Sequence, residues 1–181
     1  MKSALSRRGF LAGAFRSRPE SIRPPWAVEE ALFLDLCARC DDCIRLCPEK
    51  IVNRGSGGFP VIQFQRGECT FCGDCLTACK EGALRKESVD QAPWNLIAVI
   101  GAGCLPHKGV VCHSCREACE PRAITLRLAP MGVGMPEIGG DCTGCGACVQ
   151  VCPARSIDIL KPAPEPISPR RPEAVSLAAG V

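Results

Sequence analysis

Residues 142–153 read CTGCGACVQVCP, so three cysteines are separated by two residues each, a fourth follows after three more, and a proline stands directly behind it. The same C-x2-C-x2-C-x3-C spacing occurs at residues 37–47 and 69–79. A further group keeps the closing spacing but has seven residues after its first cysteine. The four quartets contain all 16 cysteines of the 181-residue chain: Cys37, Cys40, Cys43, Cys47; Cys69, Cys72, Cys75, Cys79; Cys104, Cys112, Cys115, Cys119; Cys142, Cys145, Cys148, Cys152.

This spacing is typical of iron–sulfur ligation. A cubane cluster has four irons, and each takes one protein thiolate. Three cysteines two residues apart lie on a tight turn that wraps one face of the cubane, and the fourth ligand comes from further away. Small residues inside the loops, such as Gly73, Gly146 and Ala147, let the backbone approach closely. The sequence therefore predicts three to four 4Fe–4S clusters per chain, bound by the sixteen cysteines.

Zinc and disulfides are the alternative readings of the cysteines. Zinc sites are built mostly from C-x2-C pairs, whereas a run of three leaves an odd ligand in every loop. Disulfides need an oxidising compartment, and no clear secretory signal is present. At the third quartet the longer spacing leaves open a distorted cluster, a labile one or a different metal. His107 and His113 flank this quartet, but four cysteines already suffice there.

The composition leaves little hydrocarbon for a conventional core. Aromatic residues make up 4% of the chain, tyrosine is missing, and 18 glycines and 16 prolines favour loops and turns. Clusters bound through thiolates can supply the missing stability, because metal binding is then also folding free energy. We therefore expect the apoprotein to be largely unfolded.

Charge and hydropathy exclude several function classes. A net charge of +3 without a long basic run argues against nucleic acid as a partner. The most apolar stretch, residues 96–102, is far shorter than the roughly 20 residues of a membrane span. Cysteine would cap every iron, and no Ser-His-Asp arrangement stands out, so we expect an electron carrier or accessory protein and not an enzyme.

The chain is organised as a repeat. Residues 51–64, with a Gly55-Ser56-Gly57-Gly58 turn, predict a short hairpin between the first two quartets. Alternation from Ala123 to Leu128 and a Gly- and Pro-rich return at residues 131–140 repeat this layout. We expect an α+β fold of two tandem ferredoxin-like modules, 31–86 and 94–162, with small hairpins and short helices around the clusters and a proline-rich disordered tail at 163–181.

The amino terminus is open to more than one interpretation. Ser6-Arg7-Arg8-Gly9-Phe10-Leu11 is typical of a twin-arginine export signal. The apolar stretch behind it ends at Phe15, Arg16 and Pro19 follow, and no small-residue cleavage site comes after a proper apolar run. We interpret residues 1–30 as a flexible basic arm of a cytoplasmic protein, with export or a docking peptide as alternatives. Trp26 and Trp94 each follow a proline, and we expect them to pack.

The quartets resemble those of bacterial-type two-cluster ferredoxins, present here twice. Pro48 and Pro153 follow the last cysteine of their runs as that pattern expects, whereas Lys80 stands in this place after the second run. The resemblance implies crossed ligation, in which the last cysteine of each run serves the other cluster of its module. The implied ligand sets are Cys37, Cys40, Cys43 with Cys79; Cys69, Cys72, Cys75 with Cys47; Cys104, Cys112, Cys115 with Cys152; and Cys142, Cys145, Cys148 with Cys119.

A more specific resemblance extends from near the start of the chain to about residue 160. The chain is similar to the NapF family, the ferredoxin-type accessory proteins of periplasmic nitrate reductase systems. The resemblance rests on the quartets in order and on Ser6-Arg7-Arg8-Gly9, Ile22-Arg23-Pro24-Pro25-Trp26, Arg54-Gly55-Ser56-Gly57-Gly58-Phe59-Pro60 and Cys119-Glu120-Pro121. It implies a cytoplasmic protein that interacts with the precursor of the nitrate reductase catalytic subunit and assists its maturation, by electron transfer or iron–sulfur assistance.

Two other functions stay open. The chain could be an electron-transfer subunit that relays electrons from a quinol or dehydrogenase partner to a terminal reductase. It could also be a structural metal-binding module without redox work, since cysteine loops can be purely architectural.

Overall fold

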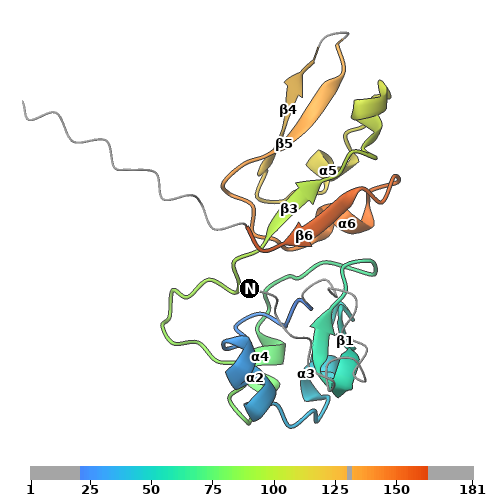
Figure 1. Cartoon of the computed structure of the whole chain (residues 1–181). Coiled ribbons are helices and arrows are strands. Elements are labelled where there is room, and N and C mark those ends of the chain that lie inside the picture. The colour runs from blue at the N-terminus through green and yellow to red at the C-terminus, as the bar shows by residue number, and fades with distance from the viewer. Residues whose placement is uncertain (1–20, 130–131, 163–181) are drawn as a thin grey trace, which may run out of the picture.

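The computed structural model of the protein describes residues 21–129 and 132–162. The Arg7-Arg8 motif and the proline-rich stretch 163–181 lie outside these residues. The described chain forms two units, one with α2, α3, α4 and the β1–β2 hairpin and one with strands β3 to β6, α5 and α6 (Figure 1).

The first module is built around one hairpin. Strand β1 (Val52–Arg54) pairs antiparallel with β2 (Pro60–Ile62), and the short 3-10 helix η1 (Ser56–Gly58) turns the chain between them. This is the hairpin that the apolar and glycine pattern predicted. Helix α2 (Glu30–Leu36) precedes the first quartet, α3 (Asp42–Leu46) lies within it, and α4 (Asp74–Ala78) lies within the second.

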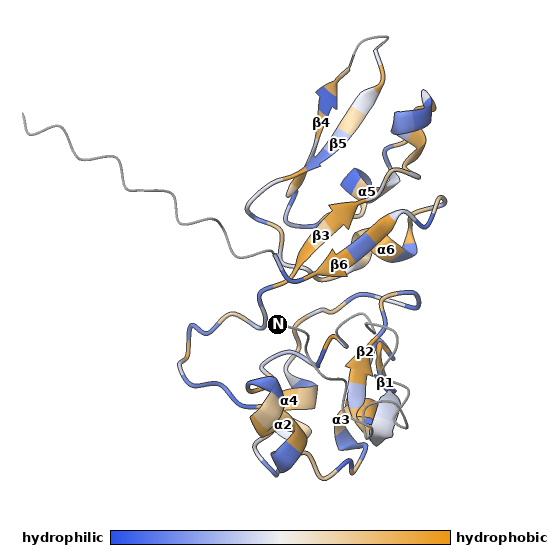
Figure 2. Cartoon of the chain, in the orientation of Figure 1, coloured by the Kyte–Doolittle hydropathy of each residue, from blue (hydrophilic) through white to orange (hydrophobic). Residues whose placement is uncertain are grey.

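The second module repeats this plan with longer strands. Strand β4 (Ile124–Leu128) pairs antiparallel with β5 (Gly134–Ile138), as the second hairpin. Strand β3 (Ile97–Ile100) pairs antiparallel with the last strand, β6 (Ile157–Leu160), so the ends of the module are joined. Both of these strands are largely apolar (Figure 2). Helix α5 (Ser114–Glu117) lies within the third quartet and α6 (Ala147–Gln150) within the fourth.

Residues 22–28 belong to the first module, which corrects their assignment to a flexible arm over residues 1–30. Ala27 forms an antiparallel bridge with Leu84, the counterpart of the β3–β6 pair. Trp26 is 5% exposed. Its indole Nε1–H donates to the carbonyl oxygen of Gln91. The segment is short and rich in proline, so its sequence shows no strand pattern, and its order comes from burial.

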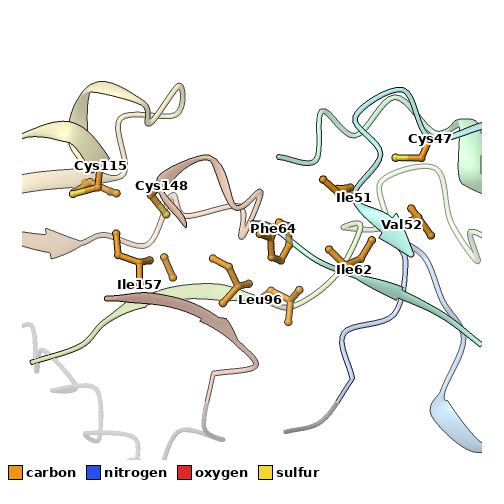
Figure 3. Close-up of a cluster of buried hydrophobic side chains, with 12 residues drawn as sticks. Cys47, Ile51, Val52, Ile62, Phe64, Leu96, Cys115, Cys148 and Ile157 are labelled. Atoms are coloured by element: carbon orange, nitrogen blue, oxygen red, sulfur yellow. The ribbon is translucent and has the colours of Figure 1, made fainter. Parts of the chain in front are cut away.

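One hydrophobic cluster extends through both modules. Phe64 and Leu96 lie between side chains of the first module, such as Ile62, and side chains of the second, such as Ile157 and Cys148 (Figure 3). A second, smaller cluster around Phe33 lies within the first module. Within residues 21–129 and 132–162, no helix is long and apolar enough to cross a membrane.

Candidate iron–sulfur sites

The cysteines gather around four cavities, with four cysteines at each. We call these groups the first to fourth sets. In every set, three cysteines come from one quartet and the last comes from the partner quartet of the same module. The sets are Cys37, Cys40, Cys43 and Cys79; Cys69, Cys72, Cys75 and Cys47; Cys104, Cys112, Cys115 and Cys152; and Cys142, Cys145, Cys148 and Cys119. This is the same grouping as the crossed sets that the resemblance to two-cluster ferredoxins implied.

A tight turn and a short helix position the cysteines of each quartet. The third cysteine lies on the helix, and the fourth is the first or second residue after the helix ends. The turn before the helix requires a left-handed backbone in three of the quartets: Gly73 has φ +83°, Gly146 has φ +88° and Asp41 has φ +64°. Glycine adopts this conformation without steric cost, which explains the C-x2-C-G-x-C pattern of the second and fourth quartets.

The irregular third quartet keeps its place through an extra turn. The residues after Cys104 form the 3-10 helix η2 (Leu105–Lys108), and Gly109 ends it in the left-handed conformation. This turn shortens the longer segment, so Cys104 lines the same cavity as Cys112 and Cys115. Of the two histidines near this quartet, neither His107 nor His113 lines the cavity.

Backbone N–H groups donate to cysteine sulfurs at the ends of the modules. Leu84 N–H donates to Cys79 Sγ, Ala98 N–H to Cys142 Sγ and Ser156 N–H to Cys152 Sγ, each over 3.4 Å. Hydrogen bonds of this kind stabilise the thiolate and raise the reduction potential of a cluster bound to it. Leu84 and Ser156 follow the last cysteine of their quartets, and Ala98 lies on β3. The segments at the ends of the modules therefore also supply these hydrogen bonds.

Burial makes several of these thiols poor acids. It raises the pKa of Cys43, Cys75 and Cys148 to about 12 each and that of Cys69 to about 11, and neighbouring thiols add to the effect. Metal binding therefore has to displace protons from these groups. The pKa is also raised, again chiefly by burial, at Cys104 and Cys115.

The donor set of each cavity fits a 4Fe–4S cluster. Four thiol sulfurs around one cavity supply one ligand for each iron of a cubane. Cys40 and Cys72 are exposed, whereas Cys47 and Cys75 are buried, so the clusters of the first module would lie near its surface but not in open solvent. Among the described residues, no three His, Cys, Asp or Glu side chains converge on a single metal ion.

Comparison with known proteins agrees with this chemistry. The 4Fe-4S dicluster domain family matches residues 36–84 and 110–157, so Cys104 lies just outside the second match. The ferredoxin-type protein NapF of Escherichia coli is 41% identical over 158 residues, which cover 87% of this chain and 95% of the relative. NapF of Haemophilus influenzae is 40% identical over 84% of this chain and 92% of its own length. The ferredoxin-type protein NapG of Escherichia coli is 34% identical over 80% and 71%.

The fold and the cysteine sites define a ferredoxin-type iron–sulfur protein with two 4Fe–4S dicluster domains in tandem. These domains and the 16 cysteines fit three to four clusters per chain. Within this class, the extent and level of identity show that the chain belongs to the NapF family of ferredoxin-type proteins.

Proposed function

We propose that the protein carries electrons one at a time through 4Fe–4S clusters held by the four crossed cysteine sets. The observation that supports this function is the assembly of four cysteines around each of four cavities. All the cysteines are taken up in these sets, which leaves each cluster fully ligated and suited to electron transfer instead of substrate binding.

We further propose that the protein works in the cytoplasm on the precursor of the catalytic subunit of a periplasmic nitrate reductase. There it assists maturation by supplying electrons or by supporting the iron–sulfur site of the precursor. The support is membership of the NapF family and identity that covers nearly the whole length of the NapF relatives.

Iron and spin content test the electron-carrying role. We expect anaerobically purified protein to contain about sixteen irons and sixteen acid-labile sulfides, since four cubanes hold four of each. Dithionite should bleach the visible absorbance and give electron paramagnetic resonance (EPR) signals of reduced clusters. Zinc, or clusters that no reductant reaches, would instead point to a structural metal-binding module.

A capture experiment tests the partner. The tagged holoprotein is mixed with the unprocessed precursor or with the mature catalytic subunit, both purified. Capture of the precursor alone supports a role in maturation. Capture of the mature subunit, together with steady electron delivery to it, would support the alternative of a respiratory electron-transfer subunit. The Cys40→Ala/Cys72→Ala variant, which alters the two exposed cysteines of the first module, removes one ligand from each of the first and second sets and so shows whether capture requires those clusters.

A further inference from the structure

The two modules are joined at a contact between two cysteine loops. The backbone N–H of Cys69, in the second set, donates a hydrogen bond to the carbonyl oxygen of Cys145, in the fourth set, over 2.8 Å. These cysteines belong to different modules and are 76 positions apart in the sequence. The peptide groups of two cluster-binding loops are therefore in direct contact.

Aromatic side chains surround this contact. The Trp94 ring packs edge-on against Phe64 and Phe71, with centroids 6.0 and 5.6 Å apart. Its indole Nε1–H donates to the carbonyl oxygen of Thr143 over 2.8 Å. Phe71 and Thr143 lie in the second and fourth quartets respectively, so Trp94 ties the two loops together from the side.

Glycines allow the loops to come this close. A methyl group on Gly146 would come within 2.7 Å of Cε1 of Phe64 and closer still to Cδ1. One on Gly144 would lie 2.6 Å from the carbonyl oxygen of Leu96, which belongs to the same module as Gly144. Phe64 is 4% exposed and lies between the modules (Figure 3). The first module thus packs directly against the fourth quartet.

We propose that the second and fourth sets adjoin across the module boundary and that electrons cross between the modules at the Cys69–Cys145 peptide contact. The four sites then follow the spatial order first, second, fourth, third. This inference rests on the electron-carrying role proposed above. Crossing moves one electron and no atom or proton: one side is oxidised by one electron as the other is reduced. The sets at the two ends, the first and third, are then the places where electrons enter and leave.

Gly146 and Gly73 provide a matched pair of variants. Both occupy the same position in their quartets, both begin a helix, and their φ values are +88° and +83°. An added Cβ meets Phe64 at Gly146 but nothing within 4 Å at Gly73. Gly146→Ala therefore adds the clash with the other module to a backbone strain that Gly73→Ala shares.

Two measurements on the full-length holoproteins test the proposal. Hydrogen exchange of the peptide that contains the Cys69 amide should be about five- to thirtyfold faster in Gly146→Ala than in the wild type and Gly73→Ala. The EPR spectrum of the dithionite-reduced protein should lose in Gly146→Ala part of the broadening that interacting clusters cause, and should keep it in Gly73→Ala. Unchanged exchange and an unchanged spectrum in Gly146→Ala would overturn the proposal.

Iron and sulfide content are measured on the same samples. Full and equal iron and sulfide content in all three proteins shows that the sites are loaded. A low iron content in the wild type would instead count against the proposed function and not against the contact between the modules. If Gly146→Ala itself loses iron, Phe64→Ala opens the contact from the other side, outside any quartet. Phe64→Ala should speed hydrogen exchange of the Cys69 amide while all four clusters are retained. Exchange as slow as in the wild type would equally overturn the proposal.

Discussion

Ser156 and Gly101 exchange two hydrogen bonds beside the third cysteine set. The N–H of Gly101 donates to the carbonyl oxygen of Ser156 over 2.7 Å, and the Ser156 hydroxyl donates to the carbonyl oxygen of Gly101 over 2.9 Å. The Ser156 N–H also donates to Cys152 Sγ. This pair therefore holds the segment before Cys104 against the segment after Cys152. Cys104 is the cysteine at which the quartet spacing is irregular.

We predict that Ser156→Ala makes the third site labile. The variant loses one hydrogen bond, worth about 1 kcal/mol, while the bond from its N–H to Cys152 remains. Roughly a quarter of the iron should then pass to a chelator about fivefold faster than in the wild type. Ser88→Ala, at an exposed position between the two modules, is the control. Uniformly faster loss of all the iron would contradict a local effect.

Pairs of cysteine variants should reveal the crossing of the ligands. Cys47→Ala/Cys72→Ala removes two members of the second set, whereas Cys47→Ala/Cys40→Ala removes one member each from the second and first sets. We expect the first pair to keep about three intact 4Fe–4S clusters and the second about two. Reduced 4Fe–4S spins per chain, counted by EPR, distinguish the two. The reverse order would show that each quartet binds its own cluster.

Arg23 should contribute measurably to the stability of the first module. Its guanidinium donates to both carboxylate oxygens of Glu30 and to the carbonyl oxygen of Pro60, and lies 4.9 Å from the Phe33 ring centroid. We expect Arg23→Ala to cost about 2–3 kcal/mol, seen as a lower thermal midpoint of the anaerobic holoprotein. Arg66→Ala, at an exposed position, is the control and should leave the midpoint unchanged.

The measurement with Arg23→Ala belongs at neutral pH. The hydrogen bond from Arg23 lowers the pKa of Glu30 from its usual 4.5, although partial burial opposes the shift. The pKa of Glu30 is lower in the folded than in the unfolded protein. The stability contributed by the Arg23–Glu30 pair is therefore fully present above pH 4.5 and is lost as the pH falls through the lowered pKa. An equal penalty for Arg23→Ala with Glu30 protonated would contradict the role of the ion pair.

The sequence predicted two tandem ferredoxin-like modules because cysteine spacing is a local property. The quartets and the β1–β2 hairpin follow from residues close together in the chain. The place of Cys104 does not follow from spacing, because spacing alone does not show that residues 105–108 form a 3-10 turn. The crossed grouping came from resemblance to a known pattern and not from the spacing itself.

The contact between the modules could not be predicted in the same way. The Cys69–Cys145 hydrogen bond joins two backbones, so no side chain marks it. Gly146 stands out in the sequence as a small residue in a cluster loop, but Gly73 stands in the same position without touching the other module. Their difference depends on Phe64, which is distant in sequence from both quartets of the second module. Residues 22–28 likewise gain their order from burial against distant residues.

Removal of iron should unfold the protein. Cys47, Cys115 and Cys148 lie within the cluster of buried side chains that joins the two modules, and Cys75 lies in the smaller cluster around Phe33. Without metal, each set becomes a cavity lined by thiols between short helices of four or five residues. Helices of this length are not stable alone, and the thiol-lined cavities replace part of the hydrocarbon that would otherwise pack the interior.

We expect the apoprotein, prepared with a chelator under reducing and anaerobic conditions, to lose most of its far-ultraviolet circular dichroism and to be cleaved rapidly by proteases throughout residues 21–162. Reconstitution with iron and sulfide should restore both the spectrum and the protease resistance, which separates unfolding from irreversible damage. Zinc added in place of iron and sulfide is the control. Zinc binds four thiolates to a single ion and does not fill a cavity as a cubane does, so it should restore neither. A cooperative thermal transition in the metal-free chain would show that hydrocarbon packing alone holds the fold.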